Sequence, residues 1–239
     1  MRRLRQMEMD LARRRAGDPR GGKRKGCGRK PKGPKAGVPH RRREALKART
    51  PLHVTVRCGQ GEWRLRRRKM AAVLAAAFRA GCSRDGFRIC QFSVQGNHLH
   101  LVIEADSAAG LSEGMRAWTI RVARAINRTL GRKGKVFPDR YHAVRLTTAR
   151  QVRAALCYVM QNARRHGLDV PVGAPDPFSS AWWFTGWTDE RWREGLEAAP
   201  EGPSVAVPRG WLLTTAWKKW GLIGPDEVPA AGRVGLAHR

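Results

Sequence analysis

The stretch that decides the fold is Phe92–Glu104, which reads FSVQGNHLHLVIE. It predicts the end of one strand, a tight turn at residues 95–97 and a second strand, because Gly and Asn suit the positive φ angles of such a turn. Successive side chains of a strand point to opposite faces, so His98 and His100 share one face. Neutral imidazoles on a rigid strand suit a divalent metal, so this hairpin predicts half of a metal site.

The segments around the hairpin predict an α+β fold. Alternating polarity predicts strands at 53–58, 87–94, 98–105 and from Tyr141 to Leu146. Apolar residues at helical spacing predict helices at 64–80, 111–130 and from Ala149 to about Arg165, the last capped by Thr148. The first six elements match the ferredoxin-like split β-α-β pattern, an antiparallel sheet with two helices on one face, and one more helix follows.

Composition divides the chain into three predicted parts. Residues 1–50 carry 19 Lys and Arg against 4 Asp and Glu, and residues 21–35 are rich in Gly and Pro, which predicts a disordered basic arm. A general electrostatic tail is the main interpretation, and an AT-hook-like contact by Arg29-Lys30-Pro31 is the alternative. Residues 51–168 form the α+β domain. Residues 169–239 form an extension with seven of the nine Trp, for which packing is favoured over base stacking.

The charge of the chain predicts an anionic partner. The formal net charge is +29, and 37 of the 48 basic residues are Arg, whose guanidinium group binds phosphate in a bidentate fork. Nucleic acid is therefore the expected partner. No apolar run has membrane length or the form of a secretory signal. The five cysteines are scattered without a CxxC pair, which indicates neither a zinc ribbon nor a disulfide framework and favours a reducing cytoplasm.

The third predicted helix supplies candidates for the other half of the site. Tyr158 and Asn162 are four residues apart and share one helix face, with Gln161 nearly as close. If this helix crosses the sheet edge near the two histidines, an amide oxygen completes a three-ligand metal site. Such a metal polarises a phosphodiester for in-line attack by the tyrosine oxygen. Three alternatives stay open: Tyr158 as a residue that only packs in the core, Tyr141 as the nucleophile, and the histidines as structural strand residues.

Three motifs now point to a known family. The triplet at 98–100, HLH, resembles the HUH motif, and with a single tyrosine in a downstream helix the chain resembles the Y1 transposases of the IS200-like group. The segments FPDRYH (137–142) and YVMQNA (158–163) resemble the REP-associated tyrosine transposases more closely. The resemblance covers about residues 53–168. It implies cleavage and rejoining of single-stranded or hairpin DNA through a 5′-phosphotyrosine intermediate, with a free 3′-OH, Mg or Mn as cofactor, and a place near the bacterial nucleoid.

The resemblance also assigns roles to residues. It makes Tyr158 the nucleophile, His98 and His100 metal ligands, and Asn162 the third ligand in place of the glutamine of IS200-type relatives, with Gln161 as the alternative. Basic residues that would line the DNA path are Arg140, Arg145, Arg164 and Arg165. A homodimer in which one tyrosine completes the partner's site is a further expectation. The competing functions are a non-catalytic DNA-binding protein or regulator on the same scaffold, and a replication initiator or relaxase.

Overall fold

The computed structural model describes residues 45–61, 63–168, 170–194 and 202–229. All of them belong to one compact unit, Val38–Arg239. Most of the predicted basic arm, including Arg29-Lys30-Pro31, lies outside the described residues.

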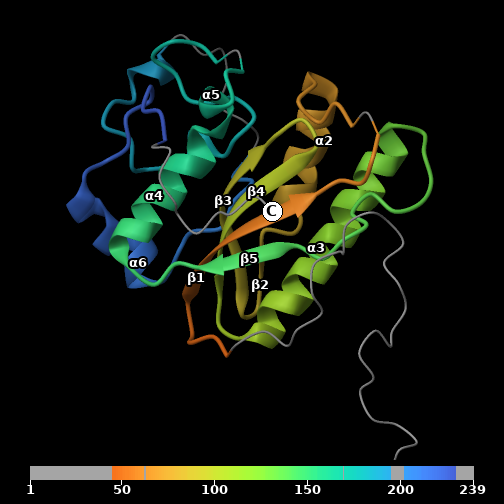
Figure 1. Ribbon diagram of the computed structural model, residues 1–239, viewed down its shortest axis with the longest axis horizontal. Helices are drawn as coiled ribbons and strands as arrows, with labels where there is room; N and C mark the ends of the chain where they lie inside the picture. The colour runs from red at the N-terminus through yellow and green to blue at the C-terminus, as the bar shows by residue number, and fades with distance from the viewer. Residues whose placement is uncertain (1–44, 62, 169, 195–201, 230–239) are drawn as a thin grey trace, which may run out of the picture. The chain divides into compact units, whose positions relative to one another are not determined.

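A five-stranded antiparallel sheet forms the centre of this unit (Figure 1). Its strands are β1 (Thr50–Arg57), β2 (Ser83–Arg84), β3 (Phe87–Val94), β4 (His98–Ala105) and β5 (His142–Arg145), in the spatial order β2-β3-β4-β1-β5. The two central strands, β1 and β4, pair along their whole length. This order confirms the predicted ferredoxin-like arrangement, with the short β2 added at one edge.

Two helices cover one face of the sheet, α2 (Arg68–Arg79) and α3 (Ala108–Thr129) (Figure 1). Their apolar stripes bury Phe78 and Trp118 against the side chains of β1, β3 and β4 that point to this face. Helix α3 begins before the predicted position 111, because the Ser107 side chain accepts a hydrogen bond from Gly110 N at 3.0 Å and caps the helix.

Helix α4 (Ala149–Met160) covers the opposite face of the sheet (Figure 1). Its predicted cap is confirmed, because Thr148 and Gln151 form a capping box. Helix α4 packs over Cys90 and Val102 in the middle of the sheet, so it lies across a face and not at an edge. The prediction of one helix to about Arg165 is wrong. Gln161 leaves helical geometry at φ −115° and ψ 18°, and a separate short helix α5 (Asn162–Arg165) follows.

The described part of the extension forms four short helices, and the last two pack on α4. The four helices are η1 (Ala181–Trp183), η2 (Arg191–Arg193), α6 (Trp211–Thr214) and η3 (Ala216–Trp220). Trp187 and Trp217 are buried in one cluster with α4, which confirms the predicted packing role for these two. Trp211 and Trp220 are instead 67% and 49% exposed.

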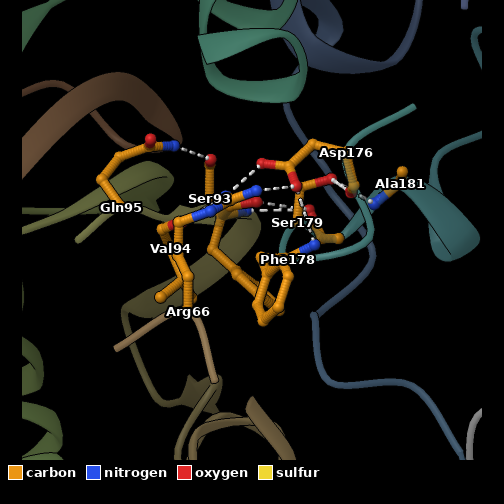
Figure 2. A network of polar contacts seen from close by, with 10 residues as sticks. Arg66, Ser93, Val94, Gln95, Asp176, Phe178, Ser179 and Ala181 are labelled. Atoms are coloured by element: carbon orange, nitrogen blue, oxygen red, sulfur yellow. Dashed lines mark hydrogen bonds and ion pairs between the residues drawn. The ribbon is translucent and has the colours of Figure 1, made fainter. Parts of the chain in front are cut away.

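Figure 2 shows how the extension joins β3. Both terminal nitrogens of Arg66 donate to the buried carboxylate of Asp176 at 2.8 Å, and one of them also donates to Val94 O at 2.8 Å. Val94 N donates to Phe178 O at 2.8 Å, and Ser93 pairs with Ser179 in an antiparallel bridge. The extension is therefore tied to the end of β3 that leads into the β3–β4 hairpin. None of the described helices is long and apolar enough to cross a membrane.

Candidate active site

Three histidines meet on the α4 side of the sheet. In the β1–β4 register, Thr55 lies opposite His100 and Arg57 opposite His98. His53 precedes Thr55 by two residues and so points to the same face. His98 Nε2 and His100 Nε2 are 3.1 Å apart, and His53 Nε2 is 3.2 Å from His100 Nδ1. In the structure, His98 and His100 therefore lie side by side on one face of the sheet, as predicted.

The neighbours of His98 favour the tautomer in which its Nε2 atom is unprotonated. His98 Nδ1 lies 2.9 Å from Asn97 Oδ1, an oxygen that only accepts, so this nitrogen carries the proton. His100 Nδ1 lies 3.2 Å from both His53 Nε2 and Thr55 Oγ1, and each of these can either accept a proton from it or donate one to it. The two Nε2 atoms face each other, and either a proton on one of them or a shared cation would stabilise this contact.

The distance between these nitrogens fits a common metal ion. Two nitrogens at about 2.0–2.1 Å from one ion, with tetrahedral or octahedral angles, lie about 2.9–3.4 Å apart. The observed 3.1 Å falls in this range. In the described part of the chain, no group of three His, Cys, Asp or Glu side chains is placed to hold a metal. A third protein ligand would therefore have to be of another type, such as an amide oxygen.

Tyr158 lies beside the histidines in the same chain. Its ring centre is 5.1 Å from that of His100 and 5.7 Å from that of His53, and both contacts are edge-on. The other tyrosine, Tyr141, packs against the cluster of α2 and α3, on the opposite face of the sheet. The structure therefore brings Tyr158, and not Tyr141, to the paired imidazoles.

The two candidate amide ligands have different surroundings. Gln161 Nε2 donates to Gly224 O at 3.0 Å and Pro225 O at 2.7 Å, so the extension holds this side chain. Asn162 is fully buried, and neither of its amide atoms has a hydrogen-bond partner among the described residues. An unpaired buried amide is costly, so an additional ligand for Asn162 is expected. Gln161 Oε1 likewise has no partner among the described residues, so both amide oxygens are open to a ligand, and Asn162 differs in leaving both of its amide atoms unpaired.

The four predicted DNA-contacting arginines have different positions. The guanidinium carbon of Arg165 lies 5.5 Å from the centre of the Tyr158 ring, and its side chain is exposed. Arg140 and Arg145 are also exposed. Arg164 is held inside the fold, because its Nη2 contacts Ala174 O at 2.8 Å and the Asp226 carboxylate at 3.2 Å.

The thiol next to Tyr158 does not compete as a nucleophile. Burial, reinforced by the negative charge of Glu227, raises the pKa of Cys157 to about 12. The thiol is therefore protonated at neutral pH, and the thiolate is the reactive form.

Sequence reasoning missed three residues of the site: His53, Thr55 and Arg57. All three lie on β1, and the alternation that predicts this strand also puts them on one face. What the sequence does not contain is the β1–β4 register, which brings that face to His98 and His100.

Residues 49–162 match the family model described as "Transposase IS200 like". No curated protein matches the chain. Solved structures are also similar to part of it, among them the following three.

A REP-associated tyrosine transposase bound to a REP hairpin has 19% identity and a TM-score of 0.47, over 60% of this chain and 82% of that one. A candidate transposase from Deinococcus radiodurans R1 has 14% identity and a TM-score of 0.35, over 54% and 99%. A bacterial tRNA(His) guanylyltransferase-like protein in complex with ATP has 15% identity and a TM-score of 0.37, over 52% and 62%. The match of residues 49–162 to the family model places the α+β domain of this chain in the IS200-like transposase family.

Proposed function

We propose that the protein cleaves and rejoins single-stranded or hairpin DNA through a covalent bond to Tyr158. The observation that carries this proposal is the position of Tyr158. Its ring centre lies 5.1 Å from that of His100, and the Nε2 atoms of His98 and His100 are 3.1 Å apart. A non-catalytic DNA-binding protein does not need a phenol beside two paired imidazoles.

The residues that would hold Mg²⁺ or Mn²⁺ are His98 and His100 through Nε2, and Asn162 through its amide oxygen. A metal bound there would polarise the phosphodiester and neutralise part of its charge. His53 and Thr55 are positioning residues in this proposal, because each can accept the Nδ1 proton of His100 and so keep its Nε2 atom ready to bind.

The chain's own residues carry the bond changes. Attack by Tyr158 Oη on phosphorus forms the phosphotyrosine bond and breaks the bond to the 3′ oxygen. The phenol gives up its proton, and the leaving oxygen takes one up and departs as a 3′-OH, so protons balance. Arg165, whose guanidinium carbon lies 5.5 Å from the centre of the Tyr158 ring, would bind a phosphate beside the phenol and stabilise the phenolate as it forms. Attack of a 3′-OH on the phosphotyrosine reverses the step and rejoins the strand.

The DNA partner follows from charge and from the exposed arginines around the site. The net charge of +29 favours a polyanion, and Arg57 is exposed opposite His98. Hairpin DNA as the substrate, and action near the nucleoid in the bacterial cytoplasm, are the forms of this proposal that the sequence resemblance implies.

The test is the formation of a covalent adduct. The full chain is incubated with labelled hairpin DNA and Mg²⁺ or Mn²⁺, and the products are separated on a denaturing gel. We expect a protein–DNA adduct that is lost with Tyr158→Phe and retained with the matched variant Tyr141→Phe. An adduct that survives Tyr158→Phe but disappears with Tyr141→Phe would refute the assignment. DNA binding without any adduct, under either metal, would favour the non-catalytic regulator.

A further inference from the structure

An exposed tryptophan with cations over its ring lies at the end of η3. The side chain of Trp220 is 49% exposed. The guanidinium carbon of Arg150 is 5.6 Å, and Lys219 Nζ 6.0 Å, from the ring centre of Trp220. Lys218, Lys219 and Arg150 are all exposed. We propose that this surface, the Trp220 platform, stacks an unpaired base of the single strand that flanks the cleaved phosphate; the identity of the strand rests on the proposed function.

The chemistry of the Trp220 platform fits single-stranded DNA. An aromatic face stacks on any base, and neighbouring cations bind the phosphates on either side of that base. The cations lie close enough to the ring for a cation–π interaction, which keeps them gathered around Trp220. A second protein would be a poorer occupant, because the centres of protein–protein interfaces are depleted of charged residues such as Lys.

Hydrogen bonds connect the Trp220 platform to α4, the helix that carries the proposed nucleophile. Arg153 on α4 donates to Gly221 O at 3.2 Å and Leu222 O at 3.0 Å, the two residues that follow Trp220. Arg150 stands in the first turn of α4, and Tyr158 follows eight residues later, about 12 Å along the helix at about 1.5 Å per residue. A strand held at Tyr158 therefore has to extend about 12 Å along α4 to reach Arg150 and the Trp220 platform.

A matched control lies in the same extension. Trp211 is 67% exposed, more than Trp220, but no cation lies over its ring among the described residues. Removing Trp211 therefore tests whether exposure of a large aromatic ring is enough, and removing Trp220 tests the combination of ring and cations.

The experiment measures binding of a fluorescent oligo-dT strand by anisotropy in the Tyr158→Phe chain, which cannot form the proposed adduct. We expect Trp220→Leu to weaken binding by about 5- to 150-fold, the range for loss of one stacked base. Trp220→Phe, which keeps an aromatic face, should recover most of the affinity, and Trp211→Leu should leave it unchanged. Lys219→Gln should reduce the magnitude of the negative slope of log K against log salt by about 0.7, the value for one phosphate contact on a single strand.

Equal affinities of the Trp220→Leu and Trp211→Leu chains would overturn the proposal, as would equal weakening by Trp220→Leu and Trp220→Phe. Adduct formation by the chain with native Tyr158 is measured separately. If the adduct forms and Trp220→Leu binds normally, the platform is wrong and the cleavage proposal stands. If Trp220→Leu weakens binding but no adduct forms, the platform stands and the cleavage proposal is wrong.

Discussion

Loss of the charge on Asp176 should destabilise the protein, because this carboxylate joins the extension to the sheet (Figure 2). Its side chain is 0% exposed and accepts two hydrogen bonds of 2.8 Å from Arg66, whose side chain is 15% exposed. Breaking a buried ion pair by removing one partner costs about 3–5 kcal/mol, because the remaining charge stays buried without compensation. Since Arg66 retains some contact with water and with Val94 O, we expect Asp176→Asn to lower the free energy of unfolding by about 3 kcal/mol.

Asp226 provides the control for this change. It also pairs with an arginine, Arg164, but at 3.2 Å and with 49% of its side chain exposed, so Asp226→Asn should cost at most about 1 kcal/mol. Urea unfolding of the full chain measures both values, with tryptophan fluorescence reporting mainly on the extension and far-UV circular dichroism on the helices. The reasoning would be refuted if Asp176→Asn and Asp226→Asn lowered the free energy of unfolding equally and the fluorescence and circular dichroism transitions coincided.

Three further predictions concern the site and its thiols. His53→Ala should lower Mn²⁺ affinity measured by calorimetry about 10- to 100-fold, with partial recovery in His53→Asn; an unchanged affinity would contradict the positioning role. Burial raises the pKa values of Cys58 and Cys157 to about 12, so their protonated forms favour the folded state. Stability from these thiols should be constant below about pH 9 and fall between about pH 9 and 12 as unfolded chains ionise, which thermal melts at increasing pH would show. Because nucleophile and ligands lie in one chain, a mixture of Tyr158→Phe and His100→Ala chains should not form the adduct, and restored adduct formation would indicate a site shared between subunits.

Local patterns predicted the elements that local interactions determine. The bounds of β3 and β4 agree with prediction, because the strands are apolar and residues 95–97 between them suit only a turn. The cap of α4 was also predictable from the sequence, because the capping box joins two residues that are only three positions apart, Thr148 and Gln151. The shared face of His98 and His100 follows from strand geometry alone, so half of the candidate site was predictable.

Contacts between distant segments explain what the sequence did not predict. His53 was assigned only to a strand, because its contact with His100 requires the register of β1 against β4. The end of α4 was placed too late, because apolar and polar residues continue at helical spacing past Gln161. The helix breaks where the Gln161 side chain binds carbonyl oxygens of residues 224 and 225, which no periodicity contains.

These contacts also explain why Tyr158 faces the histidines. Arg153, Cys157 and Gln161 are spaced by four residues and therefore form one stripe along α4. All three bind the same segment of the extension: Arg153 and Cys157 contact the Glu227 carboxylate, and Gln161 contacts the carbonyls of residues 224 and 225. Burial opposes the ionisation of Glu227, but the hydrogen bonds from Arg153 and Gly224 N outweigh it and lower its pKa, so the contact is charged at neutral pH. Because the extension holds this stripe, rotation of α4 is opposed and the neighbouring Tyr158 stays turned toward His53 and His100. The extension thus contributes to the geometry of the candidate site without supplying any of its proposed ligands.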